Sequence, residues 1–170
     1  MAANTSSCID NNVLTRIIEG AAGKEEAAFR FARRRTGLLR VIEEVRAECL
    51  TRHSVTAFDE IMRRFGMQVL PSAPGSDVTI LAHSLGIVAP SRMIDLMLLA
   101  TARRSGIGLV TGDRGLFSAA LRSGYTNVEY RIFQGDLRTR IATYHRIRAL
   151  VSQHWPDLSP TIFAGSRVGR

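Results

Sequence analysis

The chain has 170 residues, 45% of them hydrophobic and 22% charged, a globular composition long enough for one domain with a buried core. No run of about 18 uncharged apolar residues occurs, so no membrane-spanning helix is expected. The segment Met1–Ser7 lacks the basic and apolar regions of a secretory signal, and two cysteines are too few for a disulfide scaffold. We therefore expect a cytoplasmic protein in which Cys8 and Cys49 are buried thiols.

The net charge is +8 at pH 7, and all but one of the 23 basic residues are arginine, the exception being Lys24. The planar guanidinium suits phosphate, and a basic surface attracts polyanions without specifying their sequence. Two simpler explanations stay open: genomic base composition for the arginine usage, and solubility for the excess charge. The charge favours nucleic acid as a partner.

The first half of the chain alternates short apolar runs with stretches of helical periodicity. Gly20, Thr36-Gly37 and Gly66 act as stop signals between them. The predicted elements are a strand at 7–10, a helix at 12–19, a helix at 23–35, a strand at 38–42, helical stretches at 43–50 and 57–65, and a strand at 67–70.

The second half continues the alternation after a loop at 71–76. The predicted elements are helices at 77–85 and 93–105, a strand at 107–110, a helix at 115–122, a strand at 128–132 and a helix at about 136–154, with a loose tail from Pro156. The helix at 93–105 is apolar on nearly every side and is expected to be buried, with Ser91 as its N-cap. Strands alternating with helices predict an α/β fold with a mainly parallel sheet of about five strands.

Two of these strands end on a carboxylate. Asp10 follows the first strand, and Asp113 closes the run Gly108–Asp113. Ligands of open parallel sheets bind at the carboxyl ends of strands, so the two carboxylates are expected at one crevice. Asn12 and Thr111 are candidate supporting groups, because each lies two residues from one of these acids.

Two further acids lie on helices. Asp95 is in the first turn of the most apolar helix, where an unpaired carboxylate would need a metal ion, a basic partner or the helix N-terminus. Glu48 follows the second predicted strand. Each acid also has a structural explanation: Asp10 and Asp113 as helix caps, Asp95 as an N-terminal dipole residue, and Glu48 as a solvated helix acid paired with Arg52.

Four motifs resemble those of PIN-domain nucleases, and they occur in the family's order over residues 7–132. They are Cys8–Leu14, Arg46–Leu50, Met93–Ala102 and Leu109–Asp113. Asn11 departs from the family pattern, which has threonine or serine there. The resemblance implies a three-layer α/β/α nuclease domain at 1–133. The basic stretch beyond 134 exceeds a compact PIN domain and is a second departure from the family pattern. Apart from the resemblance, residues 134–170 are predicted to be a basic helix and tail that pack on this domain or extend it.

The resemblance also implies function. It makes Asp10, Glu48, Asp95 and Asp113 ligands of Mg²⁺ or Mn²⁺ in a metal-dependent endoribonuclease that is similar to VapC-type toxins. Such a toxin would have a small antitoxin as partner and can form a homodimer. Carboxylates without clustered histidine or cysteine independently favour these hard ions over Zn²⁺.

Arginines beside these motifs are candidates for binding RNA. Arg92 and Arg114 each adjoin a proposed ligand, while Arg138 and Arg140 begin a basic strip on the last helix, where Tyr144 and Trp155 could stack on bases. The alternative is that the arginines are solvated and that the apolar side of this helix packs on the domain. That side comprises Ile141, Tyr144, Ile147, Leu150 and Val151.

Three other functions remain as alternatives. A haloacid-dehalogenase-like phosphatase needs a second aspartate where this chain has Asn12, and a downstream lysine that Lys24 is too early to supply. A flavodoxin-like binding module leaves Asp95 unexplained. A PIN-like module that binds RNA or protein without cutting it would differ from the nuclease in lacking metal-dependent cleavage.

Overall fold

The structure, a computed structural model, describes residues 6–22, 27–35, 37–133 and 137–157. Its elements in chain order are β1 (Ser7–Ile9), α1 (Asn11–Ala21), α2 (Ala27–Arg34), β2 (Leu39–Ile42), α3 (Glu43–Cys49), α4 (Val55–Arg64), β3 (Gln68–Leu70), α5 (Gly75–Leu85), the 3₁₀ turn η1 (Pro90–Arg92), α6 (Met93–Ser105), β4 (Gly108–Thr111), α7 (Arg114–Arg122), β5 (Val128–Tyr130) and α8 (Leu137–His154). The start of the helix predicted at 23–35 and most of the predicted tail lie outside the described residues.

The five strands form one sheet in the order β3-β2-β1-β4-β5, and every neighbouring pair is parallel. The chain moves from β1 outward to β3, then crosses back to β4 on the other side of β1. This reversal makes the gap beyond β1 and β4 the topological switch point of the sheet. Ile9 pairs with Val110, so both strands end at the same level and their following residues, including Asp10 and Asp113, share one edge.

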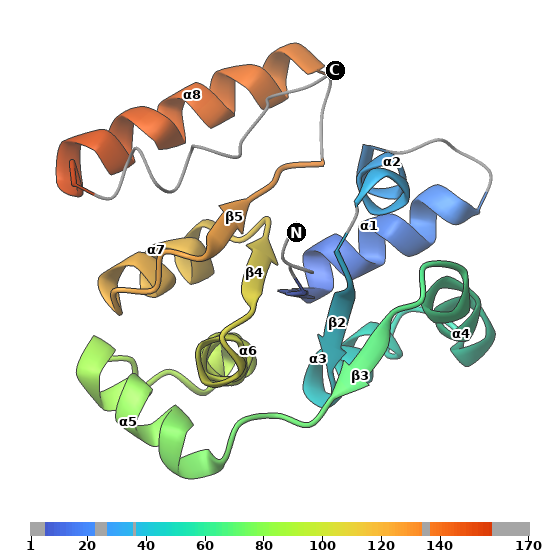
Figure 1. Ribbon diagram of the computed structural model, residues 1–170, viewed down its shortest axis with the longest axis horizontal. Coiled ribbons are helices and arrows are strands. Elements are labelled where there is room, and N and C mark those ends of the chain that lie inside the picture. Colours follow the sequence, from blue (N-terminus) through green and yellow to red (C-terminus); the bar gives the residue numbers. More distant parts are fainter. Residues whose placement is uncertain (1–5, 23–26, 36, 134–136, 158–170) are drawn as a thin grey trace.

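Helices cover both faces of this sheet (Figure 1). Right-handed crossovers place α1 to α4 on one face and α5 to α7 on the other. Accordingly, α1 packs against α2, α3 and α4, whereas α6 packs against α5, α7 and the central strands β1 and β4. The predicted three-layer α/β/α arrangement is confirmed.

The helix α6 is the central helix of its layer. Its buried residues are Leu96, Leu98, Leu99, Ala100, Thr101 and Ala102, as its all-round apolar pattern predicted. The prediction of Ser91 as its N-cap was wrong, because Pro90 starts the helical path early and places Ser91 inside η1. No described helix is by itself long and apolar enough to cross a membrane; only α5 taken with η1 and α6, bent by 116°, passes on length and composition.

The element ends differ from the predictions by one or two residues, for identifiable reasons. The strand β4 starts at Gly108 because the amide of Ile107 still bonds the carbonyl of Ala102, completing the left-handed helix end at Gly106 (φ +63°). Gly20 does not stop α1; it lies buried within the helix, which ends at Ala21.

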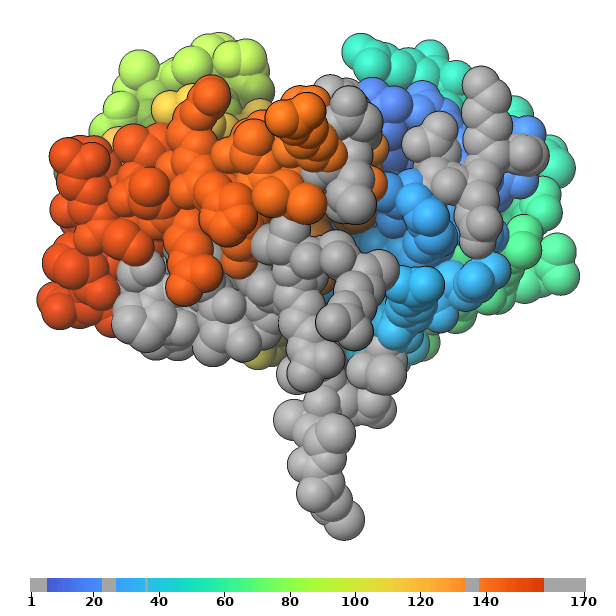
Figure 2. Space-filling model, turned by 90° about the horizontal axis from the view of Figure 1, so that it is seen from above, coloured from blue at the N-terminus to red at the C-terminus, as the bar shows by residue number. Residues whose placement is uncertain are grey.

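The last helix, α8, packs on the domain through one apolar side. Ile147 and Val151 are 4% and 2% exposed and belong to the main core, which confirms the packing alternative for these residues. Figures 1 and 2 show α8 beside β5, on the same side of the molecule as α1 and α2. On that side, an ion pair of 2.8 Å between Arg35 Nη1 and Glu129 Oε2 ties the end of α2 to β5.

Candidate active site

Asp10 is the most buried acid at the carboxyl edge of the sheet, with 5% of its surface exposed. It caps α1, since its Oδ1 accepts a hydrogen bond of 2.8 Å from the amide of Val13. Its Oδ2 accepts from the hydroxyl of Thr111 and from the amide of Gly112, the latter at 3.3 Å. The capping explanation is therefore correct, but it accounts for only one of the two carboxylate oxygens.

Burial makes the charged form of Asp10 unfavourable. Loss of water raises the pKa of this carboxyl from 3.8 to about 6, against the lowering effect of hydrogen bonds from Thr111, Val13 and Gly112. The negative charge of Asp113 adds a smaller increase. Asp10 is thus an acid that a nearby cation would stabilise in its ionised form.

Thr111, the last residue of β4, links Asp10 to Asp113. Its buried hydroxyl donates to Asp10 Oδ2, and the same oxygen accepts a bond of 2.9 Å from the amide of Asp113. Asp113 caps α7 through a bond of 2.7 Å from the amide of Leu116 to its Oδ1. Two strand ends and two helix N-termini therefore meet around one threonine, and helix N-termini favour negative charge.

Asp95 faces Asp113 through a shared arginine. Arg92 Nη1 lies 3.1 Å from Asp95 Oδ2 and 3.5 Å from Asp113 Oδ1. Burial raises the pKa of Asp95 most, the hydrogen bond from Arg92 lowers it, and the charges of Asp113 and Glu48 raise it again. Asp95 is thus half-buried with a basic partner, one of the three solutions expected for this carboxylate.

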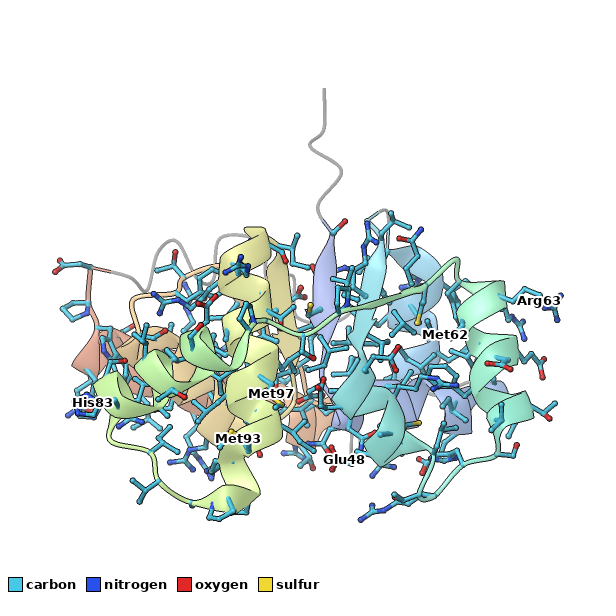
Figure 3. The ribbon with its side chains drawn as sticks, turned by 90° about the horizontal axis from the view of Figure 1, so that it is seen from below. Glu48, Met62, Arg63, His83, Met93 and Met97 are labelled. Carbon is cyan, nitrogen blue, oxygen red and sulfur yellow. The ribbon has the colours of Figure 1, made fainter. Side chains whose placement is uncertain are left out.

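Glu48 lies at the rim of this group. It is exposed on α3, at the same edge of the sheet as the first turns of α6, which Met93 and Met97 mark in Figure 3. Glu48 is a solvated helix acid, as the structural explanation predicted, but no ion pair with Arg52 is formed among the described residues. Its charge acts on Asp95, which places it in the electrostatic neighbourhood of the other three acids.

The donor set has the chemistry that a hard divalent ion requires. All four acids offer carboxylate oxygens, and their mutual repulsion is relieved by positive charge. In the described part of the chain, however, no three His, Cys, Asp or Glu side chains are close enough together to hold a metal ion. Donor type and charge thus fit Mg²⁺ or Mn²⁺, while Arg92 supplies the positive charge between Asp95 and Asp113.

The other residues predicted to support the site or bind RNA make no hydrogen bond or ion pair with the four acids in the described part of the chain, apart from Thr111 and Arg92. Asn12 is exposed on α1 and makes no hydrogen bond to the acids within the described ranges, unlike Thr111. Arg114 is exposed, and its charge acts on Tyr130 at the end of β5. Arg138 and Arg140 lie in the first turns of α8, a few residues after β5 leaves the same edge of the sheet.

Two contributors to the centre were missed by sequence reasoning. Gly112 donates its amide to Asp10, and a side chain there would lie 2.9 Å from the carbonyl oxygen of Arg131. Gly115 lies against the guanidinium of Arg92. The sequence Thr111–Gly115 could have indicated both residues, because two glycines just after a strand end often mark a place where other groups approach the backbone closely.

The two cysteines do not take part in this chemistry. Cys8 and Cys49 are buried and free, and burial raises the pKa of their thiols to about 12 and about 11. Such pKa values favour the protonated thiols at neutral pH, which argues against either cysteine as a thiolate nucleophile.

Substituting Thr111 by valine tests the link between the two aspartates. We expect a loss of stability of about 1–2 kcal/mol, because the carboxylate and the Asp113 amide both lose a partner. The pKa of Asp10 should rise further, which moves the acid limb of any Asp10-dependent activity to higher pH. Thr101→Val is the matched control, since Thr101 is equally buried and bonds Ala73 and Met97 elsewhere. Equal pH profiles for the two variants would contradict the assigned role.

A family model described as PIN domain matches residues 7–121, from β1 into the last turn of α7. The crystal structure of PAE2754 from Pyrobaculum aerophilum has a similar fold, with a TM-score of 0.51 and 17% sequence identity, covering 70% of this chain and 87% of that one. No curated protein matches the chain in sequence. The family match spans more than half of the 170 residues and contains all four motifs on which the resemblance rested. The chain belongs to the PIN domain family.

Proposed function

We propose that this protein is a metal-dependent endoribonuclease that uses Mg²⁺ or Mn²⁺ at Asp10, Asp95, Asp113 and Glu48. The PIN fold is a nuclease-type fold, and membership of the family removes the phosphatase and flavodoxin-like alternatives. One observation carries the proposal: Asp10 is buried at the switch point with a raised pKa, and Thr111 joins it to Asp113. A carboxyl with a raised pKa beside a second carboxylate, at the edge where parallel sheets bind ligands, is a candidate functional group.

Each residue has a distinct part in the proposed reaction. Asp10 and Asp113 are direct ligands, Asp95 binds directly or through water, and Glu48 completes the shell or orients the attacking water. When bound, the ion polarises the phosphate, activates water and offsets charge on the leaving oxygen. Thr111 and the amide of Gly112 hold the Asp10 carboxylate in place.

RNA cleavage by the purified protein tests this proposal. Total RNA is incubated with Mg²⁺ or Mn²⁺, and in parallel with EDTA, and cleavage is expected only where the metal is free. Cleavage that persists in EDTA would contradict the metal requirement. If no RNA is cut and calorimetry detects no metal binding, the non-catalytic alternative replaces the nuclease.

The non-catalytic alternative has one observation in its favour. Arg92 already compensates the charges of Asp95 and Asp113, so these two acids are satisfied without a metal ion. A PIN-like module that binds RNA or protein without cutting it would have this property. Metal-dependent cleavage separates the two functions.

We place the RNA backbone along Arg114 and the start of α8. Arg138 is exposed, and the buried Nε of Arg140 has no hydrogen-bond partner in the described part of the chain. This gives residues 134–170 the role of a basic extension to a nuclease domain at 1–133. The family match ends at residue 121, before β5 and α8.

Single substitutions of Arg138 and Arg140 by alanine test that placement. Each is expected to weaken RNA binding about two- to fivefold and to reduce the slope of log affinity against log salt by about one, because one phosphate contact is lost. The matched control is Arg63→Ala on α4, which Figure 3 shows far from Glu48. A salt slope that falls equally in the control would contradict a specific strip on α8.

A toxin role is the finer part of the proposal. It is supported by resemblance to VapC-type toxins and by exposed apolar side chains on α5, before η1 and at the start of α6: Ile80, Val88 and Met93 are 69%, 95% and 42% exposed. Such side chains suit a small antitoxin or a second copy of the chain. Growth arrest on expression of wild-type protein but not of Asp10→Asn, relieved by a small neighbouring gene, would support this cytoplasmic role; housekeeping RNA processing would show neither.

A further inference from the structure

Arg92 occupies a position between two proposed metal ligands. One of its nitrogens, Nη1, lies 3.1 Å from Asp95 Oδ2 and 3.5 Å from Asp113 Oδ1. These contacts join the N-terminal turns of α6 and α7, which are distant in sequence and adjacent at the switch point. Arg92 therefore supplies here the charge compensation that a bound cation would otherwise provide.

The guanidinium rests on a glycine that leaves space for it. A Cβ built on Gly115 would lie 2.3 Å from Arg92 Nη2 and 2.5 Å from Nη1. Any side chain at this position would push the guanidinium away from Asp113. Gly115 thus permits the contact without taking part in the chemistry.

The surroundings of Arg92 leave space for its side chain to move away from Asp95 and Asp113. Its side chain is 44% exposed, and it lines a cavity of about 120 Å³ whose walls include Ile87, Leu96, Leu116 and Ala119. An exposed ion pair between arginine and aspartate contributes little to stability, because water and dissolved ions screen both charges. The contact is therefore one that a divalent ion can displace.

We propose that Arg92 is a positioning residue that competes with the metal ion for Asp95 and Asp113 and so sets the metal affinity. This inference rests on the proposed function. In the metal-free protein Arg92 contacts both carboxylates and offsets their mutual repulsion. On metal binding it releases them and stays at the rim, where its guanidinium can bind an RNA phosphate.

Metal affinity measured by calorimetry with Mn²⁺ in the absence of RNA tests the inference. Arg92→Gln keeps the length and polarity of the side chain but removes its charge, and we expect Mn²⁺ to bind roughly three- to tenfold more tightly. Gly115→Ala keeps the charge but displaces the guanidinium, and we expect roughly two- to fivefold tighter binding. Alanine is favourable within a helix, so this variant should fold.

Two matched controls separate competition by Arg92 from general effects on α7. Arg122→Ala removes a positive charge from the same cavity without touching a carboxylate, and Ser118→Ala raises helix propensity without touching Arg92. Both should bind Mn²⁺ as the wild type does. A further readout is metal-free thermal unfolding, in which Arg92→Gln should melt earlier than wild type but gain more from added Mn²⁺.

The outcomes separate this inference from the proposed function. Tighter Mn²⁺ binding in Arg92→Gln and Gly115→Ala, with cleavage that needs less metal but a higher RNA concentration in Arg92→Gln, supports competition by Arg92. Unchanged or weaker Mn²⁺ binding in either variant, beside a wild type that binds the ion and cleaves RNA, overturns the inference alone. Absence of Mn²⁺ binding in every protein overturns the proposed function and the inference together.

Discussion

Replacing Asp10 by asparagine is expected to reduce metal-dependent RNA cleavage at least about a hundredfold while making the metal-free protein more stable at pH 7. A lost ligand removes several kcal/mol of charge stabilisation from the reaction, and each 1.36 kcal/mol corresponds to a factor of ten in rate. Stability changes in the opposite direction, because the buried charge disappears. The pKa of the Asp10 carboxyl is about 6 in the folded protein and 3.8 ordinarily. At neutral pH this difference means that the ionised carboxylate lowers the free energy of unfolding by about 3 kcal/mol.

Part of that gain is lost again in the variant. Asparagine can still accept from the amide of Val13, but its amide nitrogen would face the amide of Gly112, which is also a donor. We therefore expect a net gain of about 1–2 kcal/mol in the free energy of unfolding.

Urea unfolding in EDTA and cleavage assays in Mn²⁺ measure the two effects in the same preparations. Asp59→Asn, the same change at an exposed position of α4, should alter neither. A variant at Asp10 that cuts RNA at the wild-type rate, or one that is less stable than wild type in EDTA, would remove Asp10 from the proposed centre.

The sequence carries most of the information for the edge on which the site lies. Asp10 and Asp113 each follow an apolar run and precede a helical pattern, and in a parallel sheet this places them together at the switch point. The same local pattern also predicts a helix cap, and the structure shows that both interpretations hold at once. Capping uses one oxygen of each carboxylate, so local sequence alone does not separate a structural from a functional aspartate.

Contacts between distant segments could not be predicted in this way. From the sequence, Arg92 is a candidate for binding an RNA phosphate. In the structure it pairs with Asp95, three residues later, and also with Asp113, which precedes another helix. That contact depends on the distance between the first turns of α6 and α7 and on the space above Gly115. Likewise, the two bonds of the Thr111 hydroxyl follow from strand register, which a single sequence does not give.

The stability of the metal-free protein is expected to decrease as pH rises from about 5 to 7. Asp10 has a pKa of about 6 in the folded protein and 3.8 ordinarily, so between these values the folded state binds the proton more tightly than the unfolded chain. The stabilisation is fully present below pH 3.8 and is lost as pH rises through 6. Asp95, whose pKa is also raised, acts in the same direction.

Glu129 acts in the opposite direction but in a lower pH window. Its ion pairs with Arg35 and Arg131 outweigh burial and lower its pKa below 4.5, so its contribution is present above pH 4.5 and is lost only as the solution becomes more acidic. Between pH 5 and 7 Asp10 therefore dominates this balance.

Thermal unfolding of wild type and Asp10→Asn across pH 5 to 7.5, in EDTA and in Mn²⁺, isolates the contribution of Asp10. In EDTA the stability of the wild type relative to the variant should fall by about 1.4 kcal/mol from pH 5 to 7.5, because only about one pH unit of this range lies below the folded-state pKa of about 6. In Mn²⁺ the wild type should instead gain stability over the same range, because the ion binds only the ionised carboxylate and competes with the proton. If the stability difference between wild type and Asp10→Asn stays constant with pH in EDTA, the Asp10 carboxyl has the same pKa in the folded and unfolded states. The burial and hydrogen bonding that single it out would then have no bearing on metal binding.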